Sequence, residues 1–397
     1  MLKKLLFSSF LVSVSLFAHS SLLNAMEEKP GQSKSTSRLN SIDPERITGR
    51  PVQTQNGKGM QYPSLGSFEE EFLKDCRGVE LSENPGTGNI LFIGEAYGRL
   101  PMRVVRETPF FSSANIFVNE LSADNLRHLI SKVVEMKKSS EISNVWAASR
   151  MNFIVGDCLD LPENKKFTGL FRNGATDNLF DLVMCSNVIH FFDGEQVLKF
   201  FINTFNFLKP NGKAYIFTQS GAQDFSYDEM SRRRQMSDIY IKTCFGVMDS
   251  AQQDSSLLFP GLINDEWLLK TPVLQHILQV KPNGLGLNNF IPGRTLERIA
   301  DTLGFEVVSQ QFYSPEMDAR TGIISMNEDN KGAHIGIILK KPKGYTGGPV
   351  AMETLDPTFV ESCLTAKDKM KTFIDTKLDF PAGYPFVEKK KVEKKNK

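Results

Sequence analysis

The sequence predicts an α/β fold, in which a mostly parallel sheet is covered by helices on both faces. Short apolar runs alternate with segments of helical periodicity along residues 90–218. Several of these runs end in glycine or polar residues, as parallel strands do where they reach one edge of a sheet. At 397 residues, with 40% hydrophobic and 23% charged residues, the chain can form one large domain with appendages or two domains. In such sheets ligands bind at the carboxyl ends of the strands.

Composition narrows the classes of function. The formal net charge of +1 gives no general electrostatic reason to bind nucleic acid. Five cysteines have no regular spacing, and Cys158 and Cys185 fall inside or just after predicted buried strands, so they are expected to be core thiols. The five histidines are scattered, and no metal site is predicted.

The N-terminal residues 1–25 are predicted to be a signal peptide of the bacterial type. Lys3 and Lys4 precede an apolar run over residues 5–18 that is too short for a typical membrane span, and Ala25 offers a cleavage site. The chain is then exported to a periplasm or secreted, with no transmembrane span left; an uncleaved anchor is the alternative. Translation from Met26 would instead give a cytoplasmic protein. Residues 26–65 are polar, without periodicity, and are predicted to be a disordered linker.

A strand, a glycine turn and a helix follow the linker. A capping box at residues 67–70 opens a helix through residue 76. Residues 90–93 then form a strand that enters Gly94-Glu-Ala-Tyr-Gly98, and residues 99–108 form a helix. Such a turn brings backbone N–H groups and a helix N-terminus close to a ligand. The spacing is G-x-A-x-G, not G-x-G-x-x-G, and an ordinary α/β connection stays open.

The next two strands also end in polar residues. Residues 114–118 run into Asn119 and Glu120, and a helix follows over residues 123–136. Glu120 lies about one strand-helix-strand unit after Gly94, where an acid can accept both hydroxyls of a ribose. We expect this carboxylate to be exposed in an open crevice; a solvated acid with no ligand is the alternative. Residues 151–155 form the third strand, followed by Gly156 and Asp157.

Two further strands complete the parallel part. Residues 180–184 form a strand that leads into a Cys-Ser-Asn-Val-Ile-His-Phe-Phe segment over residues 185–192, and an amphipathic helix covers residues 194–208. A turn over residues 208–212 contains Pro210 and Gly212, and residues 213–218 form the fifth strand.

In this order the motifs resemble the class I S-adenosylmethionine-dependent methyltransferases, over about residues 67–342. The resemblance rests on IGEAYG at residues 93–98, FVNEL around Glu120, VGDCLDLP around Asp157, CSNVIHFF at residues 185–192 and FLKPNGKAYIF at residues 207–217. Segments that begin at Gly304 and Gly332 resemble the family's last two strands. The resemblance implies a Rossmann-like sheet of seven strands, the last antiparallel, with an inserted cap.

The resemblance also implies a donor site for S-adenosylmethionine. Two positions depart from the family pattern: Phe92 replaces the usual acid, so Glu95 or water is expected to contact the methionine amino group, and Ala96 replaces the middle glycine. His190 is the candidate base, and a packed histidine is the alternative. The expected donor-binding residues are Gly94, Glu95, Ala96, Tyr97, Gly98, Glu120, Leu121, Asp157, Cys158, Ser186 and Asn187.

The remaining segments lie outside this pattern. Residues 222–290 are predicted to form a cap that selects the substrate, with Arg232, Arg233 and Arg234 on a helix whose solvated face is the alternative. Residues 294–303 form a helix. Residues 343–397 are a C-terminal extension with one helix over residues 358–378 and a lysine-rich tail.

The predicted function is methyl transfer from S-adenosylmethionine to a small-molecule or protein acceptor. In-line displacement needs mainly positioning, and it needs a base only if the acceptor is protonated. The alternative is a degenerate fold that binds ligands or serves as a scaffold, such as an exported effector; Phe92 and the export signal favour it. A nicotinamide-dependent oxidoreductase is disfavoured by the glycine spacing.

Overall fold

The computed structural model of the 397-residue chain describes residues 52–53, 60–80, 88–107, 114–138, 150–171, 177–220, 239–264, 266–267, 286–317, 324–330 and 332–377. The predicted signal peptide, most of the linker, the three arginines at positions 232–234 and the lysine-rich tail lie outside these residues. Within the described parts, no helix has the length and apolar character needed to cross a membrane.

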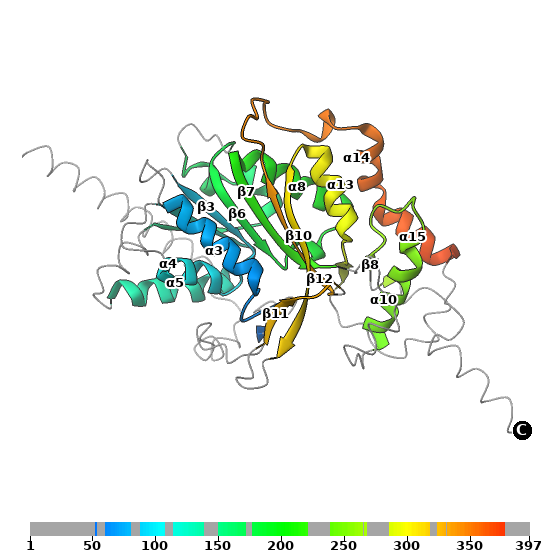
Figure 1. Cartoon of the computed structure of the whole chain (residues 1–397), viewed down its shortest axis with the longest axis horizontal. Helices are drawn as coiled ribbons and strands as arrows, with labels where there is room; N and C mark the ends of the chain where they lie inside the picture. The colour runs from blue at the N-terminus through cyan, green and yellow to red at the C-terminus, as the bar shows by residue number, and fades with distance from the viewer. Residues whose placement is uncertain are drawn as a thin grey trace, which may run out of the picture.

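An eight-stranded sheet forms the centre of the molecule (Figure 1). The strand order is β11-β10-β12-β7-β6-β3-β4-β5, with β12 antiparallel to both of its neighbours. The strands are β3 (Asn89–Ile93), β4 (Asn115–Glu120), β5 (Met151–Val155), β6 (Phe180–Ser186), β7 (Leu208–Gln219), β10 (Glu306–Met317), β11 (Ile324–Glu328) and β12 (His334–Lys340). This confirms the predicted sheet and its antiparallel last strand. The eighth strand, β11, was not predicted; it pairs antiparallel with the far end of β10, at Tyr313 to Met317.

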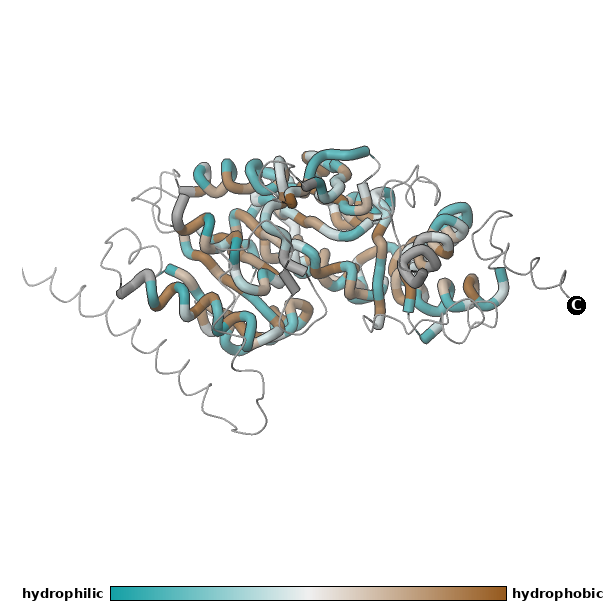
Figure 2. The backbone as a smooth tube through the Cα atoms, turned by 90° about the horizontal axis from the view of Figure 1, so that it is seen from below, coloured by the Kyte–Doolittle hydropathy of each residue, from teal (hydrophilic) through white to brown (hydrophobic). Residues whose placement is uncertain are grey.

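Helices cover both faces of this sheet (Figure 1). On one face lie α3 (Ser67–Glu80), α4 (Arg99–Glu107) and α5 (Ala123–Lys138). On the other lie α8 (Gly194–Phe207) and α13 (Gly293–Leu303), with α14 (Pro357–Leu364) and α15 (Ala366–Lys377) packed against the same core. Figure 2 shows hydrophilic (teal) and hydrophobic (brown) residues alternating along the helical parts of the backbone. The C-terminal extension is therefore part of the core as far as Lys377.

Alternate side chains of β3 enter two separate cores. Leu91 and Ile93 pack on the α8 face, and Ile90 and Phe92 pack on the α3 face. Phe92 is fully buried and meets Phe72 of α3 edge-on, with 5.5 Å between ring centroids. The aromatic ring that stands in the expected position of an acid thus fills a core, and it does not line the cavity described below.

Several element boundaries differ from the predictions. Ser67 is the first residue of α3 and not its N-cap: Glu70 N–H donates to Gly66 O, and the hydroxyl of Ser67 donates to Glu328 of β11. The helix predicted over residues 358–378 is two helices, α14 and α15. The turn at residues 208–212 is the start of β7, where pairing with β6 shifts register and Asn211 has φ 72°.

The described parts of the predicted cap include a helix and a small two-stranded antiparallel sheet. The helix is α10 (Ile239–Gln252), and the sheet pairs β8 (Leu262–Asn264) with β9 (Leu287–Asn289). Asn289 of β9 donates to the carbonyl of Phe192, just after β6, over 3.0 Å. This contact brings β9 to the carboxyl edge of the sheet.

Candidate functional site

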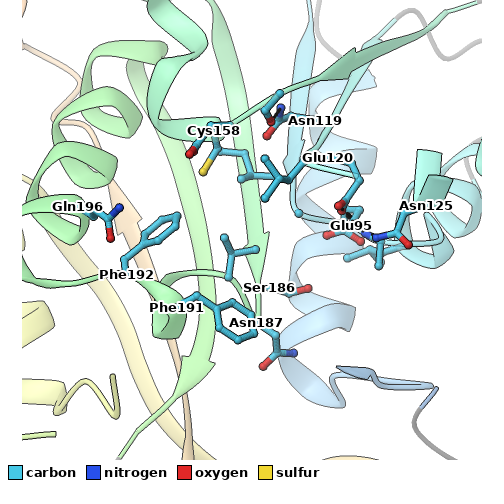
Figure 3. Close-up of a pocket in the computed structure, with 18 of the residues that line it drawn as sticks. Glu95, Asn119, Glu120, Asn125, Cys158, Ser186, Asn187, Phe191, Phe192 and Gln196 are labelled. Atoms are coloured by element: carbon cyan, nitrogen blue, oxygen red, sulfur yellow. Dashed lines mark hydrogen bonds between the residues drawn. The ribbon is translucent and has the colours of Figure 1, made fainter. Parts of the chain in front are cut away.

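A cavity of about 450 Å³ lies at the carboxyl edge of the sheet (Figure 3). It opens where the strand order reverses, between β3 and β6, which is the usual ligand position in open α/β sheets. Its walls come from the residues that follow β3, β4, β5 and β6. Its lining consists of Tyr62, Leu65, Ile93, Gly94, Glu95, Ala96, Arg99, Leu100, Asn119, Glu120, Leu121, Asn125, Gly156, Asp157, Cys158, Ser186, Asn187, Val188, Phe191, Phe192, Gln196, Gly286 and Leu287.

The glycine turn after β3 has left-handed backbone at every second residue. Gly94 has φ 69°, Ala96 φ 48° and Gly98 φ 74°. A Cβ on Gly94 would lie 2.1 Å from Val188 Cγ2, so the turn and the segment after β6 approach each other too closely for any side chain here. Gly94 N–H donates to Asn119 O over 2.9 Å, which ties the turn to the end of β4.

Two residues of the turn face away from the cavity. A Cβ on Gly98 would lie 2.5 Å from Leu129 Cδ2, so this glycine serves the packing of α5. Tyr97 is buried and meets His128 of α5 edge-on at 5.5 Å between ring centroids. Neither Tyr97 nor Gly98 lines the cavity, in contrast to Gly94, Glu95 and Ala96.

Glu120 lines the cavity, but it is not the exposed acid that the sequence led us to expect. Its side chain is buried, with 6% of the residue exposed. Oε2 accepts from Ala96 N–H at 2.9 Å, and Oε1 accepts from Ser122 N–H at 3.0 Å and Asn125 Nδ2 at 3.2 Å. The acid that ends β4 therefore holds Ala96 in its left-handed conformation, because it binds that residue's N–H group.

A second carboxyl group, Glu95, is buried beside the same turn. Burial raises the pKa of Glu95 to about 8; the positive charge of Arg99 opposes this, and the negative charges of Glu69 and Glu120 add to it. At neutral pH Glu95 is therefore mostly a protonated carboxylic acid, which can donate a hydrogen bond as well as accept one.

A buried ion pair supports this wall, and no sequence pattern predicted it. Arg99, at the start of α4, lines the cavity and donates to both oxygens of Glu69, at 2.7 and 2.5 Å. Glu69 also accepts from Leu65 N–H and from Arg103. Burial alone would raise the pKa of Glu69, but Arg99, Leu65 N–H and Arg103 outweigh it and hold that pKa below 4.5.

The segment after β5 contributes one exposed acid and one buried thiol. Asp157 caps the short helix η2 (Cys158–Glu163), with Oδ1 accepting from Leu159 N–H at 2.9 Å, and its side chain is exposed at the cavity edge. Cys158 lines the cavity, and burial with the neighbouring charge of Asp157 raises the pKa of its thiol, so the sulfur stays protonated. Cys158 and Cys185 are free buried thiols.

The segment after β6 brings Ser186 and Asn187 into the lining but leaves His190 outside it. Asn187 has φ 56°, and its N–H donates to Phe217 O over 2.7 Å. His190 belongs to the short helix η4 (Ile189–Phe191), is 4% exposed, and has its pKa lowered by burial to about 3. The candidate base is therefore a neutral imidazole packed behind the wall.

The opposite wall of the cavity consists of residues that were not among the predicted site residues, although Phe191 and Phe192 fall in the motif at residues 185–192 and Leu287 falls in the predicted cap. Phe191, Phe192 and Gln196 lie on one side of the close-up in Figure 3, opposite Glu95 and Asn125, and Leu287 of β9 completes this wall. Two phenylalanines in a hydrophobic segment look like core residues in the sequence, and no pattern joins residues 191–196 to residue 287. Across the described residues, no group of three or more histidines, cysteines or acids could hold a metal ion.

Comparison with known proteins gives structural neighbours only. No protein-family profile matches the chain, and no curated protein matches its sequence. A methyltransferase structure from Methanosarcina mazei described as SAM-dependent is 14% identical, covers 65% of this chain and 94% of its own, and has a TM-score of 0.39. A putative sarcosine dimethylglycine methyltransferase from Galdieria sulphuraria is 12% identical. The match covers 70% of this chain and 85% of the other, with a TM-score of 0.37.

A putative methyltransferase from Bacillus halodurans is 10% identical, covers 68% of this chain and 99% of its own, and scores 0.37. The strand order of the sheet, and not these scores, assigns the fold. Five parallel strands in the order β5-β4-β3-β6-β7 continue into an antiparallel β12 placed between β7 and β10. The chain therefore has the Rossmann-like fold of class I S-adenosylmethionine-dependent methyltransferases.

Proposed function

We propose that the protein is an S-adenosylmethionine-dependent methyltransferase. One observation carries the proposal: a single cavity at the switch point of the sheet combines the glycine turn, the acid at the end of β4, Asp157 after β5 and the segment after β6. The predicted donor residues come from four strand ends that are up to about 90 positions apart, and nine of the eleven line this cavity.

The residues present fit the parts of the donor. An ionised carboxylate has about four acceptor positions, and protein donors fill three of those on Glu120, so one remains on the cavity side for a ribose hydroxyl. Asp157 has its second oxygen at the cavity edge, where an exocyclic amine can donate to it. Glu95 supplies a carboxyl group at the glycine turn for the methionine end, in place of the acid that Phe92 replaces.

The chain's own contribution to the reaction is positioning. The bound donor supplies an electrophilic methyl group on a sulfonium. Ser186, Asn187 and Val188 form the wall that the acceptor approaches, and the buried aromatic side chains next to them exclude water. His190 is outside the lining and neutral, so we assign it no catalytic role, and the acceptor is one that needs no strong protein base.

Titration calorimetry with S-adenosylhomocysteine and with NAD on the same sample tests the proposal. We expect the first ligand to bind and NAD not to bind. Equal or exclusive binding of NAD would refute it, and failure to bind either ligand would favour a degenerate fold that serves as a scaffold.

The Glu120→Ala variant tests the role of the acid at the end of β4. Loss of three internal hydrogen bonds to a charged group should lower the free energy of unfolding by at least ~2 kcal/mol. Loss of a ribose contact of this kind should also weaken S-adenosylhomocysteine about tenfold or more in the folded protein. Affinity that stays unchanged in a protein of lower stability would make Glu120 a purely structural residue.

A further inference from the structure

A short segment that precedes the sheet forms part of the cavity wall. Residues 62–66, which we call the strap, lie between β2 (Met60–Gln61) and α3. Tyr62 and Leu65 of the strap line the cavity. Leu65 is buried, and the ring of Tyr62 meets His334 of β12 edge-on, with 5.6 Å between ring centroids. The cavity is therefore closed in part by residues that come before the parallel strands and their loops.

One buried carboxylate joins the strap to Arg99. Oε2 of Glu69 accepts from Leu65 N–H at 2.9 Å and from Arg99 Nη2 at 2.5 Å. Oε1 of Glu69 accepts from Nη1 of Arg99 at 2.7 Å and from Nη1 of Arg103 at 2.6 Å. The side chain of Glu69 is fully buried and lies outside the cavity lining. Glu69 can therefore act on a ligand only through the groups that it holds, which are the strap backbone and Arg99.

The end of the strap is pressed against β11. Gly66 has φ 62°, and a Cβ on it would lie 1.8 Å from Met326 O. Only glycine fits this place, because a side chain would need both the left-handed backbone and the space of that carbonyl. Gly66 N–H donates to Ser64 Oγ at 3.0 Å, and Gly66 O accepts from Glu69 N–H at 3.1 Å. The strap thus keeps a fixed position relative to Glu69.

The Arg99 end of the cavity suits a carboxylate. Helix α4 begins at Arg99, directly after the glycine turn, so a cation and a helix N-terminus lie at one end of the cavity. Glu69 takes one N–H from each terminal nitrogen of Arg99, which leaves a second N–H on each, and 14% of this side chain is exposed. Because Arg99 and Arg103 share Glu69, the buried cluster has an excess of positive charge. The proposed function places the methionine end of the donor at this turn, and that end carries the donor's carboxylate.

Resting on the proposed function, we propose that Glu69 positions Arg99 and the strap as a clamp on the amino-acid end of the donor. Arg99 binds the carboxylate, and the strap closes over the same end. Glu120 and Asp157, which the proposed function gives to the ribose and the adenine amine, are not part of this clamp. The clamp therefore acts on ligands that have the amino-acid end, and these ligands leave the cavity only when the strap opens.

Two ligands that differ only at the amino-acid end test the role of Glu69. S-adenosylhomocysteine has this end, and 5′-methylthioadenosine has a methyl group in its place. In titration calorimetry we expect Glu69→Gln to weaken S-adenosylhomocysteine about tenfold or more, the effect of a hydrogen bond to a charged group, and 5′-methylthioadenosine less than about twofold. Glu70→Gln is the matched control, because Glu70 also pairs with Arg103 but is 56% exposed, and it should change neither affinity.

Equal weakening of both ligands in Glu69→Gln would make Glu69 a purely structural residue and overturn the proposal. Failure of S-adenosylhomocysteine to bind the wild type would instead remove the proposed function, and the clamp with it.

Dissociation rates test the strap itself. Gly66→Ala forces the strap away from Met326 O, and we expect S-adenosylhomocysteine to leave this variant about tenfold faster in surface plasmon resonance. Gly304→Ala is the matched control, since Gly304 has φ 80° and no atom within 4 Å of the added Cβ, and its rate should match the wild type. Tyr62→Ala removes a ring of the wall without changing the turn, so it tests the strap even if Gly66→Ala does not fold. An unchanged dissociation rate in Tyr62→Ala would refute the closing role of the strap.

Discussion

The two halves of the cavity are built in different ways. The turn half, around Glu95, Ala96, Arg99 and Glu120, is held by hydrogen bonds to charged groups, such as Ala96 N–H to Glu120 and Arg99 to Glu69. The aromatic half, around Val188, Phe191, Phe192 and Leu287, is held by apolar packing, with β9 fixed through Asn289 to Phe192 O. A site made of directional hydrogen bonds fits one ligand, whereas an apolar wall admits molecules of similar shape.

The largest effect that separates the halves is expected from Glu69→Ala. This change leaves Arg99 in the wall of the turn half without its buried partner, and breaking a buried pair in this way costs about 3–5 kcal/mol. Urea unfolding should show this loss. Because Arg99 lines the cavity, affinity for S-adenosylhomocysteine should also fall in the folded protein.

Glu70→Ala is the matched control for that variant. Glu70 is next in the chain and pairs with Arg103, but its side chain is 56% exposed. An exposed pair contributes about 0–1 kcal/mol, so the variant should unfold within that range of the wild type. Equal losses in the two variants would contradict the structural role that we give to the buried pair.

The next effect concerns pH and Glu95. The pKa of Glu95 is raised from its ordinary value of 4.5 to about 8 in the folded chain. Between these pH values the folded protein therefore binds one proton more than the unfolded chain does. Stability from this group is fully present below about pH 4.5 and is lost as pH rises to 8, at ~1.4 kcal/mol for each pH unit. Between pH 5 and pH 7 the loss is about 3 kcal/mol.

Glu95→Gln keeps the shape of the side chain and cannot ionise. The difference in unfolding free energy between this variant and the wild type should therefore grow in favour of the variant from pH 5 to pH 7. Urea titrations at both pH values measure it. A constant difference would mean that Glu95 is ionised in the folded protein throughout this range.

The smallest effect tests the contact between the two halves. Gly94→Ala places a Cβ at 2.1 Å from Val188 Cγ2 and requires an alanine at φ 69°, which together should cost about 2–4 kcal/mol. Gly304→Ala is the control, because Gly304 has φ 80° with no atom within 4 Å of the added Cβ, and only the backbone cost of about 1–2 kcal/mol remains.

Gly94→Ala should lower the free energy of unfolding by about 1–2 kcal/mol more than Gly304→Ala does, and we attribute this difference to the contact with Val188. Adding Val188→Ala to the Gly94→Ala variant should recover most of this excess, because the clashing methyl group is gone. Thermal unfolding of the single and double variants measures the coupling. No recovery would place the clash elsewhere in the turn.

Periodicity and strand-end chemistry were sufficient to predict the central elements. The predicted strand at residues 90–93 is β3, and the strand at residues 151–155 is β5. Their apolar runs are short and end in glycine, a pattern that depends only on residues close in sequence. The acid at position 120 could be placed in the site for the same reason, since parallel strands all end at one edge of the sheet.

The environment of those acids could not be predicted. Glu120 was expected to be exposed, but it is buried because the turn after β3 folds over it and donates Ala96 N–H to it. This contact joins residues 24 positions apart, one in the turn after β3 and the other at the end of β4. Side-chain type tells what a residue can bind, whereas burial depends on which segments cover it.

The run of three acids at the start of α3 shows the limit most clearly. The sequence determines that Glu69, Glu70 and Glu71 lie on a helix, because the apolar residues around them have helical spacing. In the structure the side chain of Glu69 is fully buried against Arg99 and that of Glu70 is 56% exposed. Helical spacing turns successive side chains by about 100°, so identical residues face the core or solvent according to what packs on the helix. Through local periodicity, the sequence alone determined the sheet and the edge at which the site lies. Only the tertiary structure decided which charged residues are buried and which apolar residues form the second wall, because both depend on contacts between segments far apart in the chain.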